Sequence, residues 1–154
     1  MADTDKPQTP PRKLKLRSKK GPRQGHGPNH RVKKRNDFLR LQSEGRKVRA
    51  FNLLLVFAER RPYVDKQTGV AETITTADSR LGITVTKKID KRAARRNRLK
   101  RRIREIFRRE RGRFLFAADV VVIALDGAME LEFLELRRQL RFAFGKARIL
   151  PQKR

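Results

Sequence analysis

The sequence contains no cysteine and no tryptophan, and its only two histidines, His26 and His30, lie near the amino terminus. Without cysteine the chain can form neither a disulfide nor a thiolate zinc site, and a reducing cytoplasm is the expected compartment. No apolar run is longer than the one at residues 120–125, which is too short to span a bilayer, and no apolar signal segment stands at the start. We therefore expect neither membrane insertion nor secretion.

Acidic residues are also scarce. The chain carries 42 Lys and Arg against 16 Asp and Glu, which gives a formal net charge of +26. A compact chain with this charge repels itself, so an extended polyanion is the expected partner. Basic helices that bind membranes expose large apolar side chains opposite their charge, whereas the apolar residues here fit a core. Nucleic acid is therefore the predicted partner, and no membrane is expected.

Apolar residues are almost missing from residues 1–31, where Lys, Arg, Pro and Gly crowd together. Such a segment cannot offset its ordering entropy by burial, so we predict a disordered basic tail. This tail either makes non-specific phosphate contacts or has no role in RNA binding. The folding domain is predicted at residues 32–146, followed by a short basic C-terminal tail at 147–154.

Hydrophobic periodicity predicts helices and strands in turn along this domain. A helix that Asn36 caps and Gly45 ends comes first, and an apolar strand at 51–58 follows, with room for a partner strand at 47–51. A long polar connection at 60–78 leads to an alternating strand at 80–88. Residues 97–111 then show helical spacing, residues 119–125 form a strand buried on both faces, and residues 130–145 form a helix that covers the sheet. The expected fold is a small α/β sandwich.

The strand at 80–88 has one apolar face and one polar face. Its polar face consists of Arg80, Gly82, Thr84, Thr86 and Lys88. These residues offer donors and a close backbone approach to a single-stranded nucleic acid. An ordinary solvated sheet face would show the same alternation, so this pattern alone leaves both interpretations open.

The helix at 97–111 carries the strongest charge pattern in the chain. Leu99, Ile103, Ile106 and Phe107 share one side. A solvated helix face normally mixes charges of both signs, but only Glu105 and Glu110 interrupt this one. We therefore predict a phosphate-binding ridge on the opposite side, formed by Asn97, Arg101, Arg104, Arg108 and Arg111, with Arg98 and Lys100 at its margins.

No catalytic group is apparent. The histidines lie in the tail, Asp119 and Asp126 stand at opposite ends of one strand, and no glycine-rich phosphate loop is present. If the chain belongs to an enzyme, another component performs the chemistry. Major-groove readout of DNA favours varied polar side chains, whereas a helix saturated with Arg and Lys suits a structured RNA.

Two adjoining segments resemble a known signature. Residues 80–88 read Arg-Leu-Gly-Ile-Thr-Val-Thr-Lys-Lys, and residues 91–108 read Lys-Arg-Ala-Ala-Arg-Arg-Asn-Arg-Leu-Lys-Arg-Arg-Ile-Arg-Glu-Ile-Phe-Arg. This pattern, centred on Arg96-Asn97-Arg98, resembles that of the bacterial ribonuclease P protein, and the resemblance extends over residues 32–146. It implies a two-layer α/β (α+β) sandwich of the ribosomal S5 domain 2-like type. A mixed sheet of about four strands would pack with three helices, with a left-handed βαβ crossover that general chirality would not predict.

The resemblance also implies a function. The chain would be the protein subunit of the ribonucleoprotein that removes the 5′ leader of precursor tRNA, one protein for each RNA. The RNA subunit would carry the Mg²⁺-dependent hydrolysis, so the chain would hold no catalytic residue and no metal of its own. DNA would not be a partner.

The resemblance assigns residues to each RNA. The RNA subunit would bind Arg96, Asn97, Arg98, Lys100, Arg101, Arg104, Arg108, Lys87, Lys91 and Arg92. The leader would bind Phe38, Arg80, Thr84, Thr86 and Lys88. Phe38 would either stack on a base or anchor the first helix, and Gln42 stands where many members carry a second aromatic residue.

Three alternatives share parts of this pattern. A ribosome-associated RNA-binding protein would share the charge and the basic tail, and a DNA-compacting protein would share the charge. An autonomous nuclease would need an acid–base pair or a metal site. The Arg96-Asn97-Arg98 block in its context favours the ribonuclease P interpretation over all three.

Overall fold

The computed structural model of the chain describes residues 28–151. Its four-stranded sheet has the order β1-β2-β4-β3. The strands are β1 (Arg46–Ala50), β2 (Leu53–Glu59), β3 (Arg80–Thr84) and β4 (Ala118–Ala124). β2 pairs antiparallel with β1 and β4, while β3 and β4 are parallel, so the sheet is mixed.

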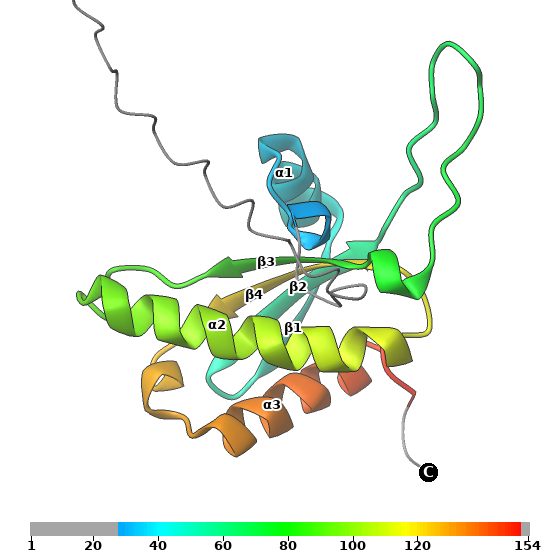
Figure 1. Cartoon of the computed structure of the whole chain (residues 1–154). Coiled ribbons are helices and arrows are strands. Elements are labelled where there is room, and N and C mark those ends of the chain that lie inside the picture. The colour runs from blue at the N-terminus through cyan, green and yellow to red at the C-terminus, as the bar shows by residue number, and fades with distance from the viewer. Residues whose placement is uncertain (1–27, 152–154) are drawn as a thin grey trace, which may run out of the picture.

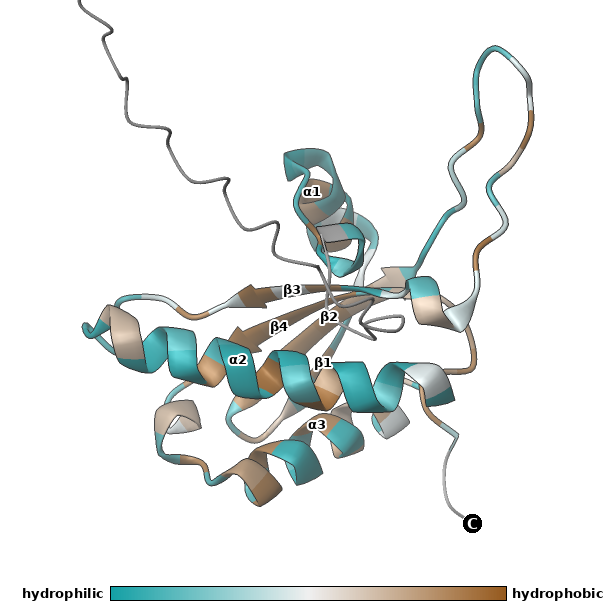
Figure 2. Ribbon diagram, viewed as in Figure 1, coloured by the Kyte–Doolittle hydropathy of each residue, from teal (hydrophilic) through white to brown (hydrophobic). Residues whose placement is uncertain are grey.

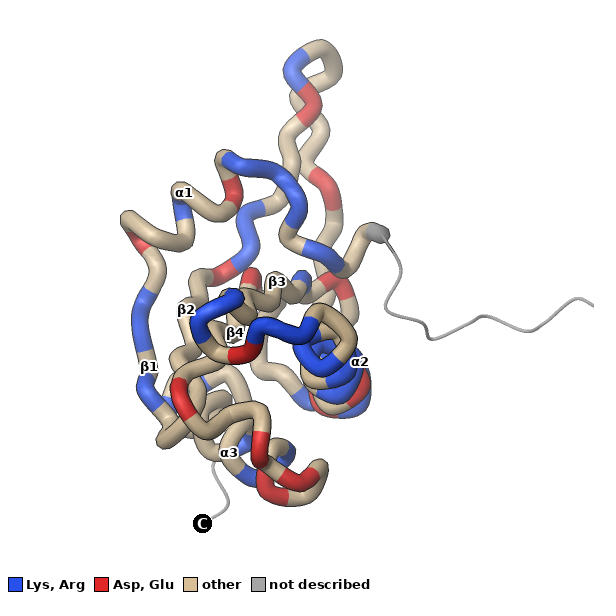
Figure 3. The backbone as a smooth tube through the Cα atoms, turned by 90° about the vertical axis from the view of Figure 1, so that its left-hand side faces the viewer, with Lys and Arg blue, Asp and Glu red and all other residues tan. Residues whose placement is uncertain are grey.

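Three α-helices pack on this sheet from both sides. α2 (Ala93–Glu110) and α3 (Phe133–Lys146) lie together on one face, and α1 (Arg35–Glu44) lies on the other (Figure 1). The predicted mixed sheet with three helices is confirmed, and α1 adds a partial third layer. The chain leaves β3, runs back along α2 and enters the parallel strand β4, and the views in Figures 1 and 3 show this crossover as left-handed.

The two faces of the sheet bury different side chains of β4. Val120 and Val122 face α2 and α3 in the main core, whereas Val121 packs with Leu41 and Val56 beneath α1. A strand that is covered on both faces has a continuous run of apolar residues in its sequence. For this reason residues 119–125 could be predicted as a buried strand. Figure 2 shows the hydrophobic strands between the hydrophilic outer faces of the helices.

Several predicted boundaries shift in the structure. α2 begins at Ala93, four residues before the predicted start, because the apolar spacing begins only at Leu99. α1 begins at Arg35 after Lys34, which makes no side-chain cap, so the prediction that Asn36 caps this helix is wrong. β3 ends at Thr84, which places Thr86 and Lys88 in the turn that leads to α2.

Both ends of the packed region lie outside residues 32–146. Arg31 forms a parallel bridge with Leu81 at the edge of β3, although it was assigned to the N-terminal tail. Ala147, Ile149 and Leu150, assigned to the C-terminal tail, are buried in the main core. The Ile149 carbonyl accepts a hydrogen bond from the Leu115 amide at 2.8 Å, so this segment closes one edge of the core. The rest of the N-terminal tail up to residue 27 lies outside the described residues.

Gly82 allows α1 to approach the sheet. A Cβ atom there would lie 3.0 Å from Phe38 Cζ and 3.1 Å from Val121 Cγ2. Gly82→Ala should therefore push the Phe38 ring outward and lower the free energy of unfolding by about 1–3 kcal/mol. Urea denaturation measures this loss.

Gly112→Ala is the matched control, because a Cβ at Gly112 would meet nothing within 4 Å. It should change the free energy of unfolding by no more than about 0.5 kcal/mol. Equal losses in the two variants would contradict the close packing of Phe38 on Gly82.

Candidate nucleic-acid interface

The apolar side of α2 fixes the orientation of its basic side. Leu99, Ile103, Ile106 and Phe107 are buried against the sheet and α3, so the polar residues between them point outward. Figure 3 shows Lys and Arg along α2 and again in the segment that leads into α1. The exposed or half-buried members of the predicted ridge are Asn97, Arg98, Lys100, Arg101, Arg104 and Arg108.

Three of the ridge arginines lack an acidic partner within residues 28–151. Among the described residues, none of Arg98, Arg101 and Arg104 forms an ion pair. The pKa of Arg104 is lowered from its ordinary value, first by partial burial and then by the charges of Arg31 and Arg101. Arg31, Arg101 and Arg104 therefore form a cluster of like charges, which a phosphate group would neutralise.

Other predicted ridge residues already have partners. Arg96 donates from Nη1 to the carbonyls of Asp90 and Lys91, each at 2.8 Å, and so closes the turn before α2. Arg108 donates to both carboxylate oxygens of Glu105. Arg111 lies past the end of α2 and is buried, and burial is the main cause of its lowered pKa, so its assignment to the exposed ridge is wrong. The unpaired charge is thus concentrated between Asn97 and Arg104.

The turn that enters α2 adds further basic side chains. Lys87, Lys88, Lys91 and Arg92 are all exposed there, and the first turn of α2 contains no acidic residue. The amide groups at a helix N-terminus carry a partial positive charge, which adds to these side chains. This end of α2 is therefore electropositive from both sources.

The sheet face beside α1 carries a row of residues that the strand register aligns. Thr84 pairs with Ile123, Ile123 pairs with Leu54, and Leu54 pairs with Arg49 across all four strands. Arg49 is exposed, whereas the other three are half-buried. We call this row the sheet strip. It offers apolar surface in its middle and polar groups at both ends. Thr86 and Lys88 follow Thr84 in the connection from β3 to α2.

Phe38 borders this face from α1. Its half-buried ring packs on Gly82 and beneath α1, so its anchoring role is observed, while stacking on a base stays a prediction. Gln42 lies one turn further along α1 and is exposed.

Arg80 mainly ties β3 to its neighbours. It donates from Nε to Asp119 Oδ1 and from Nη2 to Asp119 Oδ2, both at 2.7 Å, and from Nη1 to Asp37 at 2.9 Å. Arg40 of α1 pairs with the same buried Asp119. The hydrogen bonds that Arg80 donates to Asp119 are the main cause of the raised pKa of Arg80. This network joins α1 to β3 and β4, and leader binding by Arg80 stays a prediction.

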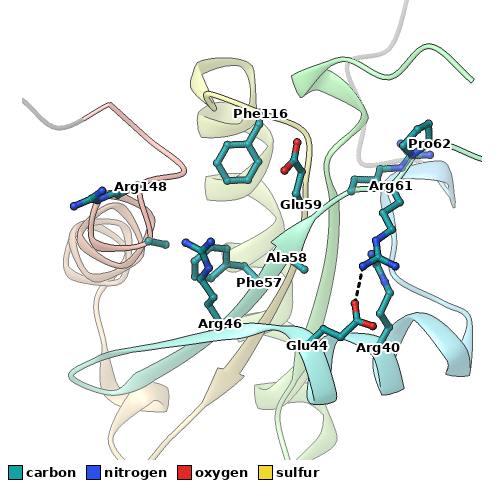
Figure 4. Close-up of a pocket in the computed structure, with 12 residues that line it drawn as sticks. Arg40, Glu44, Arg46, Phe57, Ala58, Glu59, Arg61, Pro62, Phe116 and Arg148 are labelled. Atoms are coloured by element: carbon teal, nitrogen blue, oxygen red, sulfur yellow. Dashed lines mark hydrogen bonds and ion pairs between the residues drawn. The ribbon is translucent and has the colours of Figure 1, made fainter.

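Two basic grooves flank α1. The sequence patterns did not reveal either of them. One, of about 510 Å³, is bordered by Asn29, Arg31, Lys33, Lys34, Asp37, Arg60, Glu72, Asp78 and Arg80. The other, of about 730 Å³, lies between α1, β2 and the carboxyl end of α3 (Figure 4). Arg40, Arg46, Arg61 and Arg148 line it, and Arg61 is paired there with Glu44 at 3.0 Å. The basic run at 31–35 was the only sequence signal for the first groove.

Comparison with protein families agrees with this arrangement. The family model described as Ribonuclease P matches residues 27–148. The chain belongs to the ribonuclease P protein family. The ribonuclease P protein component of Syntrophus aciditrophicus is 32% identical over 112 residues, which are 73% of this chain and 82% of that protein. The component of Gluconacetobacter diazotrophicus is 38% identical over 119 residues, 77% of this chain and 90% of that protein.

Solved structures show the same fold. The ribonuclease P protein of Staphylococcus aureus superposes with a TM-score of 0.63 at 29% identity, over 79% of this chain and 98% of that one. The protein of Thermotoga maritima, solved with a fluorophenyl thiourea, gives a TM-score of 0.57 at 32% identity, over 73% and 94% of the two chains. The chain is therefore the protein subunit of a ribonuclease P, and the ribosome-associated alternative is not favoured.

The described residues contain no group of three or more His, Cys, Asp or Glu side chains placed to hold a metal ion. Nor does any helix in residues 28–151 have the length and apolar character needed to cross a membrane. The acidic side chains described above form ion pairs with arginines, as Asp119 does with Arg80 and Glu105 does with Arg108.

Proposed function

We propose that this subunit binds the catalytic RNA through α2 and holds the 5′ leader of precursor tRNA on the sheet strip. Arg98, Arg101 and Arg104 of α2 carry the first half of the proposal, because they have no carboxylate partner among the described residues and a bound phosphate would neutralise their charge. Within α2 and the turn before it, the RNA subunit would contact Arg96, Asn97, Arg98, Lys100, Arg101, Arg104, Arg108, Lys87, Lys91 and Arg92.

The sheet strip supports the second half of the proposal. Its half-buried apolar centre, formed by Leu54 and Ile123, offers a surface for unpaired bases, and Thr84 supplies a hydroxyl at one end. Thr86 and Lys88 follow in the turn, where they would meet the leader backbone. Phe38 would border the leader from α1, and Arg80 would hold α1 in place.

The protein would then contribute binding and orientation, and the RNA subunit would supply the chemistry. Phosphates of the folded RNA would hold the Mg²⁺ ions that assist hydrolysis. We further propose one protein for each RNA, working in the cytoplasm where a cysteine-free chain would meet both RNAs.

Replacing Thr84 by Val and Lys88 by Ala should weaken binding of precursor tRNA to the holoenzyme by roughly 5- to 10-fold, since one phosphate contact and one hydrogen bond are lost. Mature tRNA lacks the leader and should bind unchanged within about twofold. Equilibrium binding of both tRNAs at one salt concentration provides the comparison.

Thr68→Val with Lys66→Ala is the matched control, because it removes the same groups from the exposed connection between β2 and β3. This control should leave both affinities unchanged. An equal loss for precursor and mature tRNA in the Thr84 and Lys88 variant would exclude leader binding at the sheet strip.

A further inference from the structure

Two phenylalanine rings lie side by side in solvent on the α3 side of the sheet. Phe51, in the turn between β1 and β2, is 70% exposed, and Phe142 of α3 is 50% exposed. Their ring centroids are 5.8 Å apart, and Lys146 Nζ lies 6.0 Å from the Phe142 centroid. Aromatic rings exposed beside a cation offer a surface on which a nucleic-acid base can stack.

The turn holds Phe51 in an unfavourable backbone conformation. Its φ of 48° lies in the left-handed region, which bulky residues rarely adopt. Asn52 fixes the turn through two hydrogen bonds with Gln139. The backbone amide of Asn52 donates to Gln139 Oε1 at 3.3 Å, and Gln139 Nε2 donates to Asn52 Oδ1 at 3.2 Å. Gln139 is buried in α3, so the surrounding structure presents an exposed ring at the cost of local strain. Such strain is often found where a residue has a binding role.

A group of arginines lies next to this aromatic pair. Glu110, only 1% exposed, pairs with Arg113 at 3.2 Å, with Arg137 at 3.2 Å and with Arg141 at 3.7 Å. One buried carboxylate thus orients three guanidinium groups and neutralises only one of their charges. Arg113 and Arg141 also line a groove of about 480 Å³ together with Phe142 and Lys146. The groove therefore combines an aromatic wall with excess positive charge.

We propose that Phe51, Phe142, Arg113, Arg141 and Lys146, here called the α3 patch, bind unpaired nucleotides of the RNA subunit. Bases would stack on the two rings, and phosphates would bind the arginines and Lys146. The inference rests on the proposed RNA-binding function and adds a second contact surface to it.

Position separates the α3 patch from the surfaces described above. It lies on the face of the sheet that α2 and α3 cover, whereas α1 and the sheet strip lie on the opposite face (Figure 1). Glu110 lies twelve residues after Arg98 along α2, which corresponds to about 18 Å along the helix axis. An RNA that contacts both the ridge and the α3 patch would therefore span most of α2.

A second copy of the chain is the competing occupant, because exposed aromatic rings also occur at dimer interfaces. A twofold interface would set the α3 patch against itself, and its Arg and Lys residues would then face like charges. The chain as a whole carries a net charge of +26, which further opposes self-association. Charge complementarity therefore favours RNA.

The test measures the affinity of the full chain for the RNA subunit. Phe142→Ser and Phe51→Ser should each weaken binding by roughly tenfold, the effect of losing one stacked base. Leu134→Ser is the matched control, because Leu134 is another exposed apolar residue of α3, and it should change nothing. Circular dichroism of each variant confirms that the fold is retained.

A fluorescent variant gives a second readout. The chain has no tryptophan, so Phe142→Trp introduces a single reporter, which should keep wild-type affinity and lose fluorescence when the RNA subunit is added. Unchanged affinity of folded Phe142→Ser, an unquenched reporter, or a dimer in sedimentation that Phe142→Ser dissociates would each overturn the α3 patch. Failure of the wild-type chain to prefer the RNA subunit over competitor RNA would instead overturn the proposed function.

Discussion

Replacing Arg98, Arg101 and Arg104 together by alanine should weaken binding of the RNA subunit by roughly 100- to 1000-fold at about 0.1 M salt. Each phosphate contact that releases one counterion contributes roughly tenfold under these conditions. The logarithmic salt dependence should also become shallower by about 2 to 3. The fold should be retained, because none of these side chains belongs to the core or to an ion pair in the described part of the chain.

The control removes three arginines that already have carboxylate partners. Arg61 pairs with Glu44, Arg109 with Glu105 and Arg138 with Glu135, all near the surface. Alanine at these three positions changes the net charge by the same amount. If the control variant lost as much affinity as the Arg98, Arg101 and Arg104 variant, general charge rather than the α2 surface would explain binding.

Asp119→Ala should produce the largest loss of stability, about 3–5 kcal/mol in the free energy of unfolding. Asp119 is fully buried and accepts hydrogen bonds from Arg80 and Arg40. Its removal would leave two largely buried guanidinium groups, with only Asp37 to pair with Arg80. Urea denaturation with circular dichroism measures the change.

Glu135→Ala provides the comparison, because its partner Arg138 is largely exposed. This variant should change the free energy of unfolding by less than about 1 kcal/mol, as is usual for a surface ion pair. A loss below about 1 kcal/mol for Asp119→Ala would show that the network does not hold α1 on the sheet.

Features that depend on local spacing could be predicted from the sequence. The apolar run of β4 and the helical spacing of Leu99, Ile103, Ile106 and Phe107 gave the right elements with the right faces, because burial repeats with the geometry of each element. Boundaries were less predictable. The first turn of α2 is too exposed to show a helical pattern, and Ile149 is buried by contacts distant in sequence.

The partners of individual side chains could not be predicted. On strand alternation alone Arg80 belongs to an exposed polar face, but Asp119 of the neighbouring parallel strand takes up its charge. The cluster of Arg31 with Arg101 and Arg104 joins residues that are about seventy positions apart. Sequence spacing located the basic residues, and only the fold shows which of the described arginines have carboxylate partners.

The distinction between paired and unpaired arginines also explains how so basic a chain can be specific. Buried or partly buried carboxylates such as Asp119 and Glu110 position the arginines around them. Arg98, Arg101 and Arg104 on α2 have no such partner among the described residues, so they can bind phosphates in a fixed arrangement. Shape-dependent recognition of a folded RNA needs such an arrangement more than it needs a high net charge.

Cleavage of a precursor tRNA at low Mg²⁺ tests the central claim most directly. The reaction would be run with a ribonuclease P RNA subunit alone, with this protein alone and with both together. We expect accurate removal of the 5′ leader only when both components and Mg²⁺ are present, and no cleavage by the protein alone. Cleavage by the protein without RNA, or no stimulation of the RNA by the protein, would contradict the account.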